Sequence, residues 1–342
     1  MKNVMFVTNS LTGGGAERSI NLVCNELVLR NWNVALVPVN KSEPDAIQVK
    51  SQIYPLNRAQ GNAPFGTIRA IISLNFVARK FKPSVVVLNC DAPEFLGLFL
   101  MKRVELVILQ HSSRPWSTRR RLGIIVRKLL SFRTQYFFAV SEHLSIWPEG
   151  KSPYRVIQNP LSPNLPKKKF FGAHPLSRIV FIGRMSKEKC PEIPLEISLL
   201  SGLPAVMIGD GELQGKLSDR YKKYQLQIDW TGQLCNPWEI INPGDVLIVP
   251  SSFEGDGLVV LEGLQRGIPI LVSDIPDFRR FNFPEINYCI SIEDYHARLI
   301  KYSNDLQSLI VPSEIAMKIL GRRDIKVLGN EWENVLEEIM KI

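Results

Sequence analysis

The sequence predicts an α/β protein made of two doubly wound domains in series, on three observations. The chain has 342 residues, a length typical of about two domains. Short runs rich in Val, Ile and Phe alternate with longer segments of helical periodicity, and they lack the period-two pattern of half-buried strands. Residues 159–175, with several prolines and three consecutive lysines, interrupt this rhythm before it restarts. Strands buried on both faces are typical of parallel sheets, so we expect one such sheet in each half.

The apolar runs are expected to be the strands, and helices separate them. In the first half the runs are VMFVTNS, NVALVPVN, SVVVLNC, ELVILQHS, QYFFAVS and RVIQNP. In the second half they are RIVFIGRM, PAVMIGDG, IDWTG, DVLIVPS, IPILVSD and YCIS. Among the helices, residues 17–31 carry apolar side chains at 20, 23, 24 and 27, and the last fourteen residues (329–342) also form an amphipathic pattern.

These elements predict an architecture with a place for a ligand. We expect domains at residues 1–165 and 166–325, with residues 326–342 forming a helix that packs back on the first domain. Ligands of open α/β sheets bind beyond the carboxyl ends of the strands. Two such sheets facing each other would leave a deep cleft between them, so the residues at the strand ends are the candidates for function.

Composition excludes several classes of protein. The chain is 45% hydrophobic and 22% charged, which is typical of a soluble globular protein. No window reaches the roughly 18 unbroken apolar residues of a membrane span, and the polar start MKNVMFVTNS does not resemble a signal peptide. The five cysteines are widely spaced and form no C-x-x-C pair. This favours reduced thiols in the cytoplasm over a disulfide framework or a zinc site.

The positive charge is concentrated in the first half. Residues 1–165 hold 21 Lys and Arg against 9 Asp and Glu, a balance of +12, whereas residues 166–342 hold 21 against 24, a balance of −3. Residues 114–133 alone carry seven basic side chains and no acid, interleaved with apolar ones. This pattern favours a helix lying on an anionic membrane. The candidate membrane residues are Arg114, Trp116, Arg119, Arg120, Arg121, Arg127 and Lys128. A packed helix with a solvated basic face is the plain alternative, and nucleic acid is a third and less favoured partner.

Glycine turns follow several of the expected strands. Gly13, Gly14 and Gly15 directly precede a helix, where backbone N–H groups can approach an anion. This loop is neither G-x-G-x-x-G nor a Walker A motif. In GRMSKEK, Arg184 and Lys189 stand beside Gly183 and suit a pyrophosphate. The turn Gly209, Asp210, Gly211 would let a ribose or base approach the backbone. Alone, the glycine loop is equally compatible with a flexible turn, GRMSKEK would be better explained as a solvated basic loop, and GDG is also compatible with a simple turn.

The segment EGDGLVVLE places Glu254 and Glu262 eight positions apart around a glycine turn. A helix is expected from Leu258, so the N–H groups of Gly257, Leu258 and Val259 would lie at a helix start and lack intrahelical partners. No histidine or matched acid cluster joins these carboxylates, and the chain has no D-x-D metal motif. The sequence therefore predicts no metal site here.

Taken in order, the glycine loop, GRM-x-KEK, GDG and the acid–x7–acid element with its P-S-x-x-E-G lead-in resemble a family 4 retaining glycosyltransferase. The resemblance covers nearly the whole chain and implies the GT-B fold of two facing Rossmann-like domains. It implies that Arg184 and Lys189 neutralise the donor pyrophosphate and that Glu262 holds the ribose. It also implies that Glu254, with the amides of residues 256–258, contacts the donor sugar. His111 matches a histidine near that sugar; without the other motifs, a core histidine would be the better interpretation.

Two positions depart from the family pattern. Cys190 stands where the family usually has glycine, and Asp256 occupies a position that is often aromatic or apolar. Asp256 could influence the choice of sugar or cap the following helix.

The activity implied by the resemblance is metal-independent hexosyl transfer, without a cofactor, from a nucleotide sugar that is most commonly a UDP-sugar. The acceptor would be a glycan or lipid-linked glycan in O-antigen, capsule or lipooligosaccharide synthesis at the inner face of the plasma membrane. The alternatives are another enzyme of this fold, such as a nucleotide-sugar epimerase, and a non-catalytic membrane partner that binds a nucleotide sugar.

Overall fold

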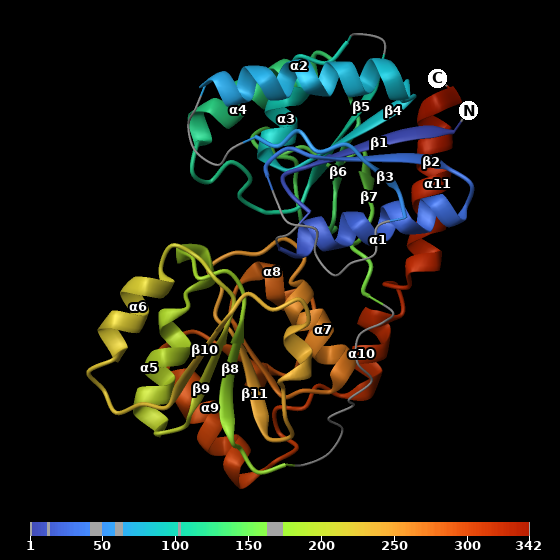
Figure 1. Cartoon of the computed structure of the whole chain (residues 1–342). Coiled ribbons are helices and arrows are strands. Elements are labelled where there is room, and N and C mark those ends of the chain that lie inside the picture. Colours follow the sequence, from blue (N-terminus) through green and yellow to red (C-terminus); the bar gives the residue numbers. More distant parts are fainter. Residues whose placement is uncertain are drawn as a thin grey trace. The chain divides into compact units, whose positions relative to one another are not determined.

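The computed structural model describes residues 2–11, 14–41, 50–58, 64–101, 104–162 and 174–341. The chain divides into two compact units, residues 1–162 together with 322–342, and residues 163–321. The predicted boundaries, after residues 165 and 325, lie three and four residues from these divisions. Each unit is built on its own parallel sheet (Figure 1). The cleft expected between the units stays a prediction.

The first unit contains a seven-stranded parallel sheet with strand order β3-β2-β1-β4-β5-β6-β7. Its strands are β1 (Asn3–Thr8), β2 (Asn33–Pro38), β3 (Gln52–Ile53), β4 (Val85–Asn89), β5 (Glu105–Gln110), β6 (Phe137–Ala139) and β7 (Arg155–Val156). Its helices are α1 (Gly15–Leu29), α2 (Pro64–Phe81), α3 (Asp91–Gly97), α4 (Arg120–Ser131) and α11 (Ile325–Lys341). Every residue of β1 and β4 is buried, as expected for strands covered on both faces.

Helices cover both faces of this first sheet. On one face, apolar side chains of α1 and α11 pack against alternate strand residues such as Phe6 and Val87. On the other, α2, α3 and α4 pack against the intervening residues, such as Met5 and Leu88. Figure 1 shows α1 and α11 on one side of the sheet and α2, α3 and α4 on the other. The last helix of the chain is therefore part of the first unit.

The second unit contains a six-stranded parallel sheet with strand order β10-β9-β8-β11-β12-β13. Its strands are β8 (Arg178–Ile182), β9 (Ala205–Ile208), β10 (Ile228–Gly232), β11 (Asp245–Val249), β12 (Ile270–Ser273) and β13 (Tyr288–Cys289). Its α-helices are α5 (Glu192–Ser201), α6 (Gln214–Tyr221), α7 (Leu258–Arg266), α8 (Pro276–Arg279), α9 (Ile292–Asn304) and α10 (Ser313–Leu320). Three short 3₁₀ helices complete it: η1 (Lys187–Lys189), η2 (Pro237–Glu239) and η3 (Glu285–Asn287).

The fold class predicted from the sequence is confirmed, and each predicted run contains a strand. The sequence patterns did not predict β3, a two-residue edge strand whose residues are both exposed. A strand this short and exposed leaves no apolar run in the sequence. The predicted helix 17–31 corresponds to α1, which begins two residues earlier.

Candidate functional site

The motifs of the second unit meet at one edge of its sheet. Because β9, β8 and β11 are parallel neighbours, their carboxyl ends lie side by side. GRM-x-KEK follows β8, GDG follows β9, and the segment EGDG connects β11 to α7. This is the edge at which open α/β sheets bind their ligands.

An ion pair joins two of these motifs. Lys189 Nζ contacts Glu254 Oε1, and both side chains are largely shielded, with 27% and 15% of their surface exposed. Ser251 Oγ donates a hydrogen bond of 3.2 Å to the same carboxylate oxygen. The backbone is also joined, because Ser252 N donates to Glu188 O at 2.9 Å. The structure thus brings Lys189, which is predicted to bind the pyrophosphate, into direct contact with Glu254, which is predicted to bind the sugar.

The backbone of Glu254 is held by a residue that the sequence did not single out. Glu254 N donates to Asp277 Oδ2 at 3.1 Å, and Asp277 is buried near the start of α8. Asp277 lies 23 residues further along the chain. No spacing rule links it to the acid–x7–acid element, so only the fold reveals this partner.

The GDG turn packs directly against the GRM loop. Gly183 N donates to Ile208 O, and Met185 N donates to Asp210 O, each at 2.9 Å. Gly209 has φ +129°, and a Cβ atom at this position would lie 1.9 Å from the carbonyl oxygen of Gly183. Glycine is required here because the two loops approach too closely for any side chain. Arg184, beside this junction, is exposed to solvent.

The start of α7 is the predicted amide-rich turn. Gly257, with φ +61°, is the N-cap residue, and Leu258 and Val259 are the first residues of the helix. No side chain caps this end, and the first N–H groups of an α-helix have no intrahelical acceptor. The positive end of the helix dipole also lies here. This geometry suits an anion or a hydroxyl-rich ligand.

Asp256 forms an ion pair that neither sequence-based interpretation included. Its side chain is 3% exposed and forms a 3.0 Å ion pair with Arg280, which also donates to the carbonyl oxygen of Asp256 at 2.7 Å. It does not cap α7. This ion pair joins the EGDG turn to the end of α8, and the assignment of Asp256 to donor binding stays a prediction.

Glu262, on the second turn of α7, is buried beside a tryptophan. Trp238 Nε1 donates to Glu262 Oε2 at 2.7 Å. The Arg266 guanidinium lies 4.4 Å from the centre of the Trp238 ring and donates to Glu262 O at 2.9 Å. One carboxylate oxygen is therefore oriented by the indole. Trp238 lies in η2, 24 residues before Glu262, and no sequence signal linked the two residues.

The candidate residues of the first unit lie at the carboxyl edge of their own sheet. Gly14 is the N-cap of α1 and Gly15 its first residue, following β1. Gly13 lies outside the described residues. His111 directly follows β5 and is half-buried. In this sheet β4 separates β1 from β5.

Two of the predicted membrane residues are instead part of a buried network. Arg127 is 2% exposed and donates from Nε and Nη2 to the two carboxylate oxygens of Glu94, at 2.9 and 2.6 Å. Trp116 is also buried, and its Nε1 donates to Glu94 Oε2 at 2.7 Å. The membrane assignment of Arg127 and Trp116 is therefore wrong, because Arg127 of α4 and Trp116, in the turn before α4, both donate to the Glu94 carboxylate of α3. Arg114, Arg119, Arg120, Arg121 and Lys128 are exposed.

Asp91 extends this network towards the end of β4. Its Oδ1 accepts a hydrogen bond from Trp116 N at 3.3 Å. Burial, followed by the nearby Glu94 carboxylate, raises the pKa of Asp91 to about 6. This carboxyl group therefore titrates closer to neutrality than an exposed aspartate.

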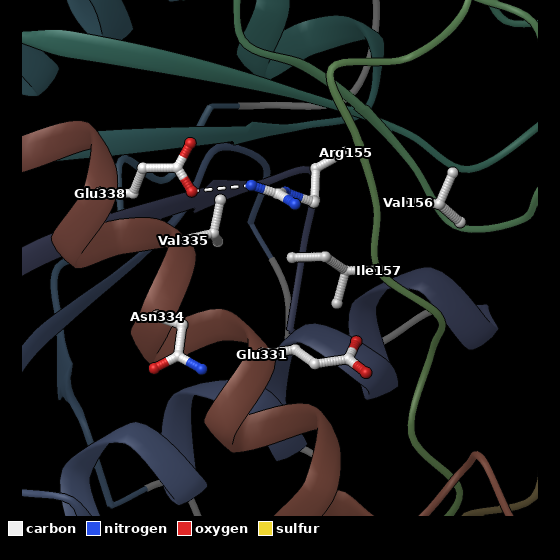
Figure 2. Close-up of a pocket in the computed structure, with 7 residues that line it drawn as sticks. All are labelled: Arg155, Val156, Ile157, Glu331, Asn334, Val335 and Glu338. Atoms are coloured by element: carbon white, nitrogen blue, oxygen red, sulfur yellow. Dashed lines mark hydrogen bonds and ion pairs between the residues drawn. The ribbon is translucent and has the colours of Figure 1, made fainter.

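A cavity of about 480 Å³ also opens in the first unit, between β7 and α11. Figure 2 shows Arg155 directed at Glu338, with an Nη2–Oε2 distance of 2.7 Å. The lining residues are Arg155, Val156, Ile157, Glu331, Asn334, Val335 and Glu338. None of them belongs to the motifs described above, so we place the candidate site at the motif-bearing edge and not in this cavity.

Two further features bear on function. Within the described ranges, none of the helices combines the length and apolar character that a membrane crossing requires. In the same ranges, no group of three or more His, Cys, Asp or Glu side chains is arranged to hold a metal ion.

The two parallel sheets, with these motifs at the carboxyl edge of the second, define the GT-B class of glycosyltransferase folds. Residues 167–305 match the family described as glycosyl transferases, group 1. The structure is similar to HepE of Anabaena in complex with UDP and glucose, with a TM-score of 0.78 and 14% identity over 98% of this chain and 99% of that one. The chain thus has the GT-B fold, and the match of residues 167–305 to the group 1 family agrees with the resemblance drawn from the motifs.

Two bacterial glycosyltransferases are sequence relatives of this chain. The chain is 29% identical over 179 residues to an Escherichia coli UDP-Gal:alpha-D-GlcNAc-diphosphoundecaprenol alpha-1,3-galactosyltransferase, covering 47% of this chain and 43% of the relative. The match therefore spans less than half of that relative's length. It is 21% identical to a Campylobacter jejuni alpha-1,4-N-acetyl-D-galactosaminyltransferase that acts on a diNAcBac-PP-undecaprenol glycan, over 77% of each chain.

Proposed function

We propose that the protein is a retaining glycosyltransferase that moves a sugar from a UDP-sugar to a lipid-linked glycan in surface polysaccharide synthesis. The observation that carries the proposal is the contact between Lys189 and Glu254 at the carboxyl edge of the second sheet, beside the amide-rich start of α7. It puts a cation for the leaving phosphate next to a carboxylate for the sugar. The named substrates of the E. coli and C. jejuni relatives support the donor and acceptor classes.

In the proposed reaction, the bond between the anomeric carbon and the diphosphate oxygen breaks. A bond forms between that carbon and an acceptor hydroxyl oxygen on the same face, and the hydroxyl proton passes to an oxygen of the leaving phosphate. The departing nucleoside diphosphate gains negative charge. Arg184 and Lys189 stabilise it, and a preorganised donor of this kind contributes about 2.7–4 kcal/mol to lowering a barrier.

The remaining residues hold the donor. Glu262, oriented by Trp238, accepts hydrogen bonds from the ribose hydroxyls, while Glu254 and the first amides of α7 hold the sugar. We propose that neither a metal ion nor a cofactor takes part, because the two cations already supply the charge that a metal would provide. We also propose that the enzyme works at the inner face of the plasma membrane without spanning it, where a lipid-linked acceptor is presented.

The first test is ligand-induced stabilisation. A ligand that binds only the folded state raises its apparent stability in proportion to affinity and concentration. Thermal unfolding measured against a panel of nucleotide sugars should show a rise in Tm for one UDP-sugar and for UDP, also in the presence of EDTA. No rise with any member of the panel would contradict the proposal.

The second test separates a transferase from a protein that only binds. Lys189→Ala and Arg184→Ala should each lower turnover by about 10²–10³-fold, measured as UDP released in the presence of an undecaprenyl-diphosphate glycan acceptor. Arg184 is exposed, so its loss leaves the fold unchanged. Lys187→Ala is the matched control, because Lys187 lies in the same 3₁₀ helix as Lys189 and is exposed like Arg184. Near-normal turnover of Lys189→Ala and Arg184→Ala would rule out this mechanism. Formation of an epimerised nucleotide sugar by the wild type would instead identify the protein as a nucleotide-sugar epimerase.

A further inference from the structure

Helix α2 carries apolar side chains on the face turned away from the sheet. Its inward face is formed by Ala70, Leu74, Val77, Ala78 and Phe81, which belong to the buried core of the first unit. Phe65, Ile68, Ile72 and Phe76 are instead 84, 54, 65 and 67% exposed. Their spacing of three or four residues places them in one stripe on the opposite side of the helix. A helix on the surface of a globular protein ordinarily carries polar side chains there.

The apolar surface continues over the neighbouring helices. On α4 and just after it, Ile125, Leu129 and Phe132 are exposed, and after α3 so are Phe99 and Met101. Figure 1 shows α2, α3 and α4 on the same side of the first sheet.

Hydrogen bonds join these helices into one surface. Asn75 of α2 donates to the carbonyl oxygen of Phe99 at 3.0 Å. Arg133, after α4, donates to the carbonyl oxygens of Gly97 and Leu98 at 2.8 and 3.0 Å. We call the exposed side chains of α2, α4 and the end of α3 the α2–α4 face.

The charges on this face all have one sign. α2 bears Arg69, Arg79 and Lys80, and α4 bears Arg120, Arg121, Arg127 and Lys128; neither helix contains an Asp or Glu. Arg127 is turned inwards and paired with Glu94, whereas the other six basic side chains are exposed. Exposed apolar side chains on helices whose only charged residues are cations fit a bilayer with anionic headgroups, because each part meets its complement. Nucleic acid would match the cations and leave the apolar stripe uncovered.

We propose that the protein docks on an anionic membrane through the α2–α4 face, with the apolar stripe of α2 entering the interface. The docking element is thus a surface of three helices and not the segment 114–133 alone. The purpose of this surface rests on the proposed lipid-linked acceptor, but its test does not depend on transfer.

Vesicle sedimentation of the full chain tests the proposal. Vesicles of phosphatidylcholine with about 30% phosphatidylglycerol should bind the protein at low salt, vesicles of phosphatidylcholine alone much less, and added salt should weaken binding. Ile72→Asp/Phe76→Asp removes part of the stripe, and Arg121→Glu/Lys128→Glu reverses two charges. Each pair should reduce binding by about tenfold or more.

Matched controls lie on the second unit. Ile290→Asp/Ile300→Asp changes two exposed apolar side chains, and Lys216→Glu/Lys222→Glu reverses two exposed charges. Both controls should bind vesicles as the wild type does. All variants should keep the Tm rise caused by the donor nucleotide, which shows that the fold and the donor site are intact.

Three results would overturn the docking proposal. The first is absence of wild-type binding to anionic vesicles, and the second is equal loss of binding in the face variants and their controls. The third is use of the same residues for another partner, seen as tighter binding to duplex DNA or RNA, or as a dimer in sedimentation velocity that Ile72→Asp/Phe76→Asp dissolves. The glycosyltransferase proposal would survive all three, because donor binding and turnover are measured separately.

Discussion

The two units share a parallel-sheet plan but use their charged side chains differently. In the second unit, Lys189 and Glu254 lie partly exposed at the carboxyl edge of the sheet, and Glu262 is buried one turn into α7 beside them. In the first unit the ion pair of Glu94 with Arg127 is buried between α3 and α4, while apolar and basic side chains of α2 and α4 are exposed. The difference teaches that a charged residue in a basic or acidic motif has to be located before it is assigned a function.

The largest effect is expected at the buried ion pair of Arg127 and Glu94. Arg127→Ala should destabilise the first unit by about 3–5 kcal/mol, because it leaves the Glu94 carboxylate buried without its partner. Urea unfolding monitored by circular dichroism measures the loss. Arg120→Ala, in the same helix but exposed, should change stability by less than about 0.5 kcal/mol. Equal effects of the two substitutions would refute the buried-pair interpretation.

Glu262→Gln tests the opposite case, a carboxylate placed for a ligand. The glutamine carbonyl can still accept from Trp238, so the fold should persist, whereas the charge-assisted bonds to the ribose are lost. Such bonds contribute about 1.5–3 kcal/mol, so KM for the donor should rise about tenfold or more with little change in kcat. Steady-state kinetics separates the two constants. Glu239→Gln, on the exposed side of η2, is the control; a fall in kcat alone for Glu262→Gln would contradict the ribose role.

The raised pKa of Asp91 makes the stability of the first unit depend on pH. Its pKa is raised from 3.8 to about 6, so the folded state holds this proton after the unfolded chain has released it. The free energy of unfolding therefore falls as pH rises between these two values. Asp91→Asn does not titrate and keeps the acceptor for Trp116 N. Relative to the wild type, it should gain on the order of 2 kcal/mol between about pH 4 and pH 7. Urea midpoints at both pH values provide the measurement, and a gain that does not change with pH would exclude this cause.

The smallest effect concerns the residue that departs from the family pattern. Cys190 follows η1 with φ +47° and ψ +52°, the left-handed region that favours glycine. Cys190→Gly should therefore stabilise the second unit by about 1 kcal/mol, read from the urea midpoint. Cys235 is exposed and is not among the described residues with positive φ. Cys235→Gly should give no gain, and a gain of similar size there would point to loss of a thiol rather than relief of strain.

Much of the fold follows from local sequence patterns. The buried strands are recognisable as apolar runs rich in β-branched residues. Glycines such as Gly209 mark the loops where two backbone segments approach each other. Local patterns also located the motif residues, because the residues of each motif directly follow one strand and are close together in the sequence. The edge strand β3 was missed because two exposed residues carry no pattern.

Pairings across the chain could not be predicted in the same way. The partner of Arg127 is 33 residues away, and that of Trp238 is 24 residues away. Composition indicated that segment 114–133 is basic and apolar, but it could not show that Arg127 of α4 and Trp116 of the preceding turn both bond to Glu94 in another helix. Likewise, apolar residues occur on both sides of α2, so the exposure of Phe65 and Ile72 is visible only once its inward face is known.

The place of α11 in the first unit has a consequence for how the protein is made. Trp332 and Leu336, close to the end of the chain, are almost completely buried against strands from the beginning of it. Residues 163–321 form the whole second unit and emerge from the ribosome before α11 does. Domains generally fold as units during synthesis. We therefore expect the second unit to fold first, and the first unit to complete its core only after α11 has been translated.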